Sequence, residues 1–250
     1  MIRALALVCL LFASHGAWAQ SGAQSGAQSG AQSGTDEQAR LEQAFDEIVF
    51  GAAHAVPRDI VLRIEGPVVF LPKGRFSEAN LAVLEAHAAE LTALTGFPVR
   101  MERGERIEPD ERPFWIYAVS RALVPAVVER RWIAPSLRAV MANALCSFVT
   151  RGDHRIKEAV IVIKRNLDPA TINHCLIEET SQALGAIDDT GLLDPSGFND
   201  LGGLVARLQP ADRLILRALF AEEVKAGMTR AAVLAILPDL IDRARLRELR

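Results

Sequence analysis

Apolar residues along the chain recur with two periods, and each period predicts one kind of element. Apolar positions three or four residues apart predict helices, whereas alternating or continuous apolar runs predict strands. Strands are expected at 60–64, 68–71, 98–102, 114–120, 146–149 and 159–164. Helices are expected at 36–50, between Ser77 and Gly96, over most of 121–145 with a break near 132–135, at 169–184, at 210–223 and from Thr229 to the end. We expect 68–71 to pair beside 60–64, and 159–164 to be central in the sheet. Most predicted strands lie in the first two thirds of the chain, and the last part is helical. This order predicts an α+β (mixed α/β) fold.

Capping residues mark the ends of the helix at 169–184. Asp168 is a good N-cap, and Pro169 suits the first helical position because its missing N–H has no intrahelical partner there. Gly185 is a natural C-cap, since glycine adopts the left-handed conformation without strain. Pro238 lies inside the last predicted helix, where the lost N–H and a steric clash are expected to break or kink it.

Residues 1–19 resemble a secretory signal peptide. Arg3 gives a positive start, residues 4–13 are almost wholly apolar, and Ala17-Trp18-Ala19 is a small-x-small cleavage site. The apolar run is shorter than the roughly 20 residues that span a bilayer. We therefore expect cleavage, export to the periplasm or the medium, and no transmembrane segment in the mature chain.

The mature chain is expected to consist of a linker and one domain. Residues 20–35 repeat a four-residue unit of small polar residues, SGAQ, with no charge and no large side chain. Such a segment cannot bury a core and predicts a flexible linker. Residues 36–250 contain no obvious internal linker and predict a single domain.

The charge balance excludes one class of partner. Removal of the signal peptide takes away Arg3 and leaves 27 basic against 31 acidic residues, a formal charge of −4. Nucleic-acid binding relies on basic surface to neutralise phosphates, so we expect no nucleic-acid partner.

Two cysteines, Cys146 and Cys175, remain after the signal peptide. An even pair in an exported protein predicts a disulfide, which would close a loop of about 30 residues. The alternative is two buried free thiols.

The helix at 169–184 carries polar residues beside its apolar face. At about 100° per residue, Ile172, Leu176 and Ala183 define the buried face, and Glu179 lies about 40° from its middle. Glu179 should be at least partly buried, and a buried carboxylate must be hydrogen-bonded, paired or protonated. Residues 178 and 182 are four apart, so their side chains can point at one common atom.

The stretch "EETSQALGAID" can be aligned without a gap with the zinc signature HExxHxxGxxH, and it resembles the metzincin proteases. The resemblance places Glu178, Gln182 and Asp188 at the three ligand positions. It places Glu179 at the general base, and Gly185 at the glycine that turns the chain toward the metal. It implies a small twisted sheet, a central active-site-type helix and C-terminal helices.

Two further similarities extend along the chain. "DPSGFND" followed by "LQPADRLILRALF" resembles the metzincin Met-turn and its following helix, with Phe198 in the methionine's place and Asn199 and Asp200 after it. The pattern C-x-x-E-E-x-x-Q-x-L-G, with a later F-N-D and G-M-T, also resembles a family of uncharacterised exported bacterial proteins. That family is catalogued as a domain of unknown function and implies no known activity.

The ligand positions depart from the zinc signature because all three histidines are absent. Zn²⁺ favours imidazole and thiolate ligands, with carboxylate as a common partner, so we expect no zinc. A weakly bound, oxygen-ligated ion at Glu178, Gln182 and Asp188 is the remaining metal hypothesis. Without a Lewis acid, Glu179 alone cannot activate water for amide hydrolysis.

Other catalytic arrangements are not visible in the sequence. His87 lies on an apolar helical stripe typical of a core histidine, and His174 lies off the carboxylate face. With His54 and His154 they form no second metal motif. The serines at 147, 181 and 196 lack the G-x-S-x-G context of a hydrolase nucleophile.

Three interpretations of the polar residues on the central helix follow. They could be a hydrogen-bond cluster that ties the helix to the next loop, or they could line a cleft that binds without catalysis. A working hydrolase would instead use Glu179 as its base, with a non-zinc metal or no metal. We favour a pseudoenzyme-like module that binds a peptide, a cell-envelope component or a protein, with the hydrolase as the alternative.

Overall fold

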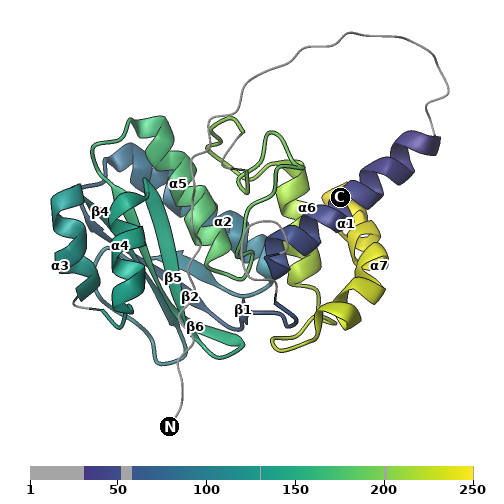
Figure 1. Cartoon of the computed structure of the whole chain (residues 1–250), viewed down its shortest axis with the longest axis horizontal. Coiled ribbons are helices and arrows are strands. Elements are labelled where there is room, and N and C mark those ends of the chain that lie inside the picture. The colour runs from purple at the N-terminus through teal and green to yellow at the C-terminus, as the bar shows by residue number, and fades with distance from the viewer. Residues whose placement is uncertain (1–30, 52–57, 130, 200–201, 250) are drawn as a thin grey trace.

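The computed structural model describes residues 31–51, 58–129, 131–199 and 202–249, with side chains described from Asp36 onward (Figure 1). The predicted signal peptide and residues 20–30 of the predicted linker lie outside these ranges. Helix α1 (Ala31–Phe50) includes the last five residues of that linker and ends where the first helix was expected to end.

The described strands form one sheet of six strands, most of them parallel. The order is β1-β6-β4-β2-β3, with β5 also pairing with β6. All pairs are parallel except β5 with β6, which is antiparallel. The strands are β1 (Arg63–Ile64), β2 (Val68–Gly74), β3 (Val99–Met101), β4 (Arg112–Val119), β5 (Cys146–Gly152) and β6 (Arg155–Lys164). The predicted central position of 159–164 is confirmed.

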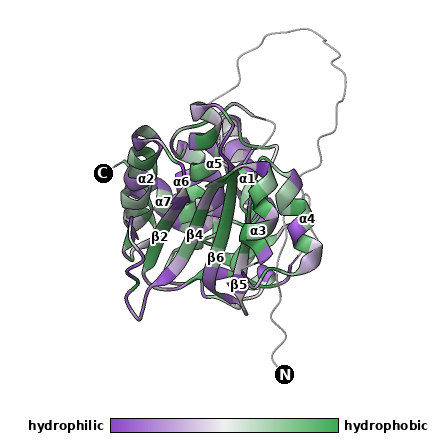
Figure 2. Ribbon diagram, turned by 90° about the vertical axis from the view of Figure 1, so that its left-hand side faces the viewer, coloured by the Kyte–Doolittle hydropathy of each residue, from purple (hydrophilic) through white to green (hydrophobic). Residues whose placement is uncertain are grey.

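Helices pack on both faces of this sheet, as Figures 1 and 2 show. They are α2 (Glu78–Thr95), the 3₁₀ turn η1 (Arg121–Leu123), α3 (Val124–Glu129), α4 (Pro135–Asn143), α5 (Pro169–Gln182), α6 (Pro210–Leu219) and α7 (Arg230–Glu248). Alternate residues of a strand face opposite sides. Accordingly, Val160 and Val162 pack with α3 and α4, while Ile161 and Ile163 join the larger core of α1, α2, α5, α6 and α7. The mixed α/β class is confirmed, and no described helix is long and apolar enough to cross a membrane.

The predicted pairing of 68–71 beside 60–64 is wrong. β1 is confined to Arg63–Ile64 and pairs with the start of β6, whereas β2 lies between β3 and β4. Ile60 forms only an isolated antiparallel bridge to Thr229. A short connection can join only antiparallel neighbours, and this part of the sheet is parallel, so the two segments cannot lie side by side.

The predicted break at Pro238 is also wrong, because α7 continues through it as one helix. The predicted N-cap is confirmed: the Thr229 side chain accepts a hydrogen bond from the Ala232 N–H. Leu237, Leu240 and Ile241 of α7 are buried in the main core. Burial of this face stabilises the helix enough to offset the hydrogen bond that proline removes.

Candidate functional site

Helix α5 starts at the predicted cap and runs through the interior of the protein. The Asp168 side chain accepts hydrogen bonds from the N–H groups of Ala170 and Thr171. Every residue from His174 to Gln182 is buried, beneath α2 and against β5 and β6. A helix that is buried around its whole circumference must satisfy its polar side chains inside the protein. The acidic residues of α5 are therefore interior groups.

The predicted disulfide joins Cys146 of β5 to Cys175 of α5, with Cα atoms 5.9 Å apart. It lies one turn before Glu178 and Glu179 on the same helix. The covalent bond therefore holds the acidic part of α5 against the edge of the sheet.

His174 contacts Glu178, contrary to the expectation that it lies off the carboxylate face. Its Nε2 is 3.6 Å from Glu178 Oε2, because residues four apart are neighbours on a helix. The Val205 N–H donates to His174 Nδ1 at 3.1 Å. Since Nδ1 accepts this bond, the proton of the neutral ring lies on Nε2 and faces the carboxylate.

Glu178 and Glu179 lie beside Cys146, and the three residues form a group of potential metal ligands. Each of the two residues is only 3% exposed, which confirms the expected burial of Glu179. One oxygen from each lies with Cys146 Sγ in a set whose atoms are all within 4.8 Å of one another. Within the described part of the chain, no other group of three histidine, cysteine or acidic residues could hold a metal ion. The disulfide occupies the Cys146 sulfur in this state.

Gln182 and Asp188, the other two proposed ligand positions, are engaged in hydrogen bonds near the end of α5. The Gln182 amide donates to Asp189 Oδ1 at 2.7 Å. Asp188 Oδ1 accepts from the Asp189 N–H at 3.0 Å, and the Asp188 N–H donates to Ile48 O. These contacts tie α5 to the following loop and to α1, as the hydrogen-bond interpretation expected.

Gly185 does not cap α5 directly, and this expectation is corrected. The helix ends at Gln182 with Ala183 as its C-cap, and Gly185 lies two residues further on with φ of 138°. A Cβ at this position would be 2.5 Å from Leu62 O and 3.0 Å from Arg63 Cα. The glycine is needed because the chain passes tightly against the backbone that leads into β1.

Gly185→Ala is expected to lower the free energy of unfolding by about 1–3 kcal/mol, the cost of a strained backbone conformation. Urea denaturation followed by circular dichroism measures this. Gly191→Ala is the matched control, because a Cβ there meets nothing within 4 Å. Equal effects of the two substitutions would contradict the close approach at Gly185.

The segment that resembles a Met-turn is held by Asp212 of α6. The Asp212 carboxylate accepts hydrogen bonds from Ser196 Oγ, the Gly197 N–H and the Gln209 N–H. Burial raises the pKa of Asp212, and these donors oppose that shift. Phe198, in the methionine's place, is fully buried. Asn199 is also buried, and its side-chain amide donates to Leu193 O; Asp200 lies outside the described residues.

Asp212→Ala is expected to lower the free energy of unfolding by about 2–3 kcal/mol, because it leaves buried N–H and hydroxyl donors without their acceptor. Equilibrium unfolding in urea gives the value. Asp212→Asn keeps one oxygen for the backbone donors and should lose less. A larger loss for asparagine than for alanine would show that the carboxylate does not act as this acceptor.

A serine, a histidine and a carboxylate meet between α2 and α5, where the sequence showed no such arrangement. His87 Nε2 is 3.1 Å from Ser181 Oγ, and His87 Nδ1 is 3.8 Å from Glu90 Oε2. The arrangement of serine, histidine and carboxylate resembles a catalytic triad. Ser181, however, has no exposed surface from which it could reach a substrate. Burial lowers the pKa of His87, which Glu90 partly offsets. The contact therefore ties α5 to α2, and the expected core position of His87 is confirmed. The sequence could not show the contact because its members lie on different helices.

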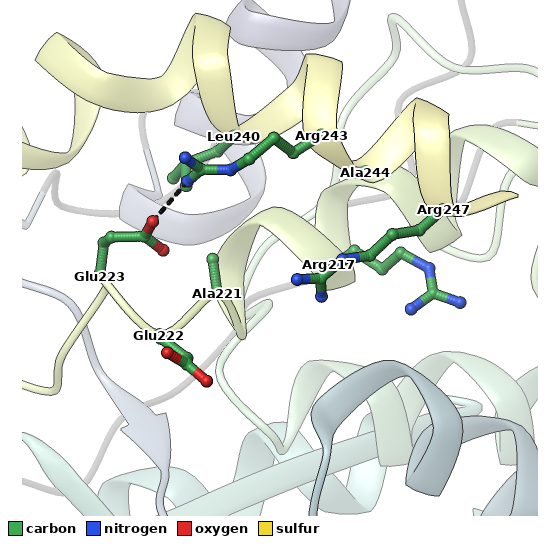
Figure 3. A pocket seen from close by; sticks show the side chains of 8 residues that line it. All are labelled: Arg217, Ala221, Glu222, Glu223, Leu240, Arg243, Ala244 and Arg247. Carbon is green, nitrogen blue, oxygen red and sulfur yellow. Dashed lines mark hydrogen bonds and ion pairs between the residues drawn. The ribbon is translucent and has the colours of Figure 1, made fainter.

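A hollow of 160 Å³ lies between α6 and α7 (Figure 3). No residue of α5 lines it. Leu240, Ala221 and Ala244 contribute its apolar lining. Three of its five charged residues form ion pairs: Arg243 with Glu223 at 2.7 Å, and Arg217 with Glu248 at the end of α7. We assign the hollow to helix packing.

The fold and the site define an α/β protein whose central helix is joined to the sheet by a disulfide and carries buried acidic residues. A family model described as a protein of unknown function (DUF2927) matches residues 38–239. The chain belongs to this family, in agreement with the expectation of an uncharacterised family. No curated protein and no solved structure matches the chain.

Proposed function

We propose that the protein is an exported, non-catalytic binding module of degenerate metzincin type, and that it binds an extended peptide along the outer edge of β5. One observation carries this proposal. β5 pairs with β6 on one side, and no described strand pairs with its other side. α5 packs against β5 and β6 and is joined to β5 by the disulfide.

The register of β5 identifies which backbone groups face that outer edge. The Lys164 N–H donates to Leu145 O, and Cys146 is opposite Ile163. Hydrogen-bonded pairs alternate along an antiparallel ladder, so Ser147 and Val149 bond to β6. The N–H and C=O groups of Cys146, Phe148 and Thr150 point away from β6. These residues are 6%, 4% and 5% exposed, so a peptide must open this edge to reach them. A peptide strand that adds to a sheet edge uses such a row of groups.

The contacts of the acidic residues favour binding over catalysis. Gln182 donates to Asp189, Asp188 accepts from a backbone N–H, and the Cys146 sulfur is in a disulfide. Gln182, Asp188 and Cys146 thus each have a structural role in this state. These contacts compete with a metal for its ligands, and without a Lewis acid Glu179 alone does not activate water for amide hydrolysis.

The order of elements is consistent with the metzincin resemblance. The resemblance implies a strand, a helix, further strands and then a central helix. The chain has β2, α2, β3, β4, β5, β6 and α5 in this order, with η1, α3 and α4 inserted between β4 and β5. The disulfide supports export, since disulfides persist in oxidising compartments.

A peptide library tests the proposal, with peptides as long as the seven residues of β5. We expect some members to bind, as measured by fluorescence anisotropy. N-methylation at alternate positions of a bound peptide should weaken binding when the methylated amides face β5, but not when they face away. Thr150→Pro should also weaken binding because it removes an outward N–H, whereas Thr150→Val keeps that N–H and should not. Absence of binding, or binding that ignores both changes, would exclude this edge.

The hydrolase alternative rests on the burial of Glu179 beside Glu178. Mass spectrometry of the same peptides after incubation tests it, with and without added Mn²⁺. Cleavage that is lost in a folded Glu179→Gln variant would favour a hydrolase over the binding module. Intact peptides in every case would favour the binding module.

A further inference from the structure

Three potential metal ligands lie close together where β5 and α5 are joined, and a fourth, Cys175, is bonded to one of them. Cys146 Sγ and the carboxylate oxygens of Glu178 and Glu179 lie within 4.8 Å of one another, and Cys175 Sγ is bonded to Cys146. All four residues are buried, with Cys146 the most exposed at 6%. Two sulfurs and two carboxylates suit four-coordinate Zn²⁺.

The disulfide controls whether this set can bind an ion. A metal is bound by thiolate, and neither sulfur of a disulfide carries that charge. A dithiol reductant supplies two electrons and two protons: the S–S bond breaks, two thiols form, and the dithiol becomes a disulfide. Zn²⁺ then displaces the thiol protons as it binds.

We propose that Cys146, Cys175, Glu178 and Glu179 form a redox-controlled site for Zn²⁺ or a similar ion. The site is closed while the disulfide is intact and takes one ion per chain after reduction. It goes beyond the proposed peptide binding, which requires neither metal nor reduction. It also differs from the ligand set of the zinc signature, with which it shares only Glu178.

The surroundings of the carboxylates set how tightly the ion is held. His174 Nε2 lies 3.6 Å from Glu178 Oε2, so His174 is a positioning residue for this carboxylate. Glu178 and Glu179 already have interaction partners in the folded chain, and the ion must compete with them. The bound ion also replaces the disulfide as the link between β5 and α5.

Cys175→Ala tests the site without a reductant, because it leaves Cys146 as a free thiol beside both glutamates. With Co²⁺ as the probe, we expect one ion per chain and a thiolate-to-cobalt absorption band in the near ultraviolet, which Zn²⁺ abolishes. The Cys146→Ala/Cys175→Ala variant should show no band. Adding Glu178→Gln and Glu179→Gln to Cys175→Ala should weaken binding at least about tenfold, since even the loss of an outer-shell partner has such an effect.

The unsubstituted chain provides a second measurement in case Cys175→Ala does not fold. A water-soluble trialkylphosphine reduces the disulfide: phosphorus takes the oxygen of water, and the two hydrogens of water end on the sulfurs. Zn²⁺ should then raise the melting temperature of the reduced chain and leave that of the oxidised chain unchanged. No cobalt band in folded Cys175→Ala, or no zinc effect on the reduced chain, would overturn the proposal.

Discussion

Replacing Cys146 and Cys175 together by alanine is expected to lower the free energy of unfolding by about 3–4 kcal/mol. The disulfide links residues 29 positions apart, and in the chain-entropy model the closed loop removes conformations from the unfolded state. For a domain of this size the loss corresponds to a fall in melting temperature of roughly 10 °C. Urea denaturation and thermal melting followed by circular dichroism give the two values.

Two comparisons separate the contribution of the cross-link to the free energy of unfolding from the contribution of the packed sulfur atoms. Each single alanine variant loses the same cross-link but keeps one thiol in place, so it should fall close to the double variant. The reduced, unsubstituted chain keeps both sulfurs and should show most of the loss. A loss below about 1 kcal/mol in the double variant would mean that the bridge does not constrain the unfolded chain as the model requires.

Features that depend on local chemistry could be predicted from the sequence. Ser77 caps α2 in a capping box with Asn80, and Gly96 ends that helix with φ of 79°. Asp168 and Thr229 cap α5 and α7. In each case the residue acts within one helical turn of its own position, so the sequence around it contains the whole signal.

Features that depend on distant partners could not be predicted. Arg63–Ile64 resembles part of a longer strand, but its partner is the start of β6, far along the chain. Pro238 has the local chemistry of a break, yet the burial of α7 in the core overrides it. Strand pairing and tertiary burial are properties of the assembled fold, and the hydrophobic pattern does not name the partner.

The same distinction applies to the candidate site. The burial of Glu179 follows from the periodicity of α5 and was predicted. The partner of Gln182 was not, because it is Asp189 of an irregular loop. The contact between His87 and Ser181 joins two helices that are separated in sequence by the whole of β3 to β6. The helical periodicity of the sequence therefore predicted which groups are buried. The partners of these groups depend on the tertiary fold.

Phe198→Ala is expected to lower the free energy of unfolding by about 3–5 kcal/mol, through lost burial and the cavity that it leaves. The ring is fully buried in the main core. The Phe198 N–H donates to Ser196 Oγ at 2.9 Å, and Phe198 O accepts from the Thr190 N–H at 2.7 Å. Because the backbone is held on both sides, the loop cannot move inward to fill the space, and the cost should lie toward the upper end.

Phe198→Met is the matched control, and it also tests the resemblance to a Met-turn. Methionine is flexible and retains much of the volume of the ring, so the loss should stay below about 1.5 kcal/mol. Equilibrium unfolding in urea compares the two variants. A large loss for both would show that the pocket is shaped for an aromatic ring and that this turn has diverged from a methionine-bearing one. A small loss for both would mean that the loop relaxes, which its hydrogen bonds to Ser196 and Thr190 argue against.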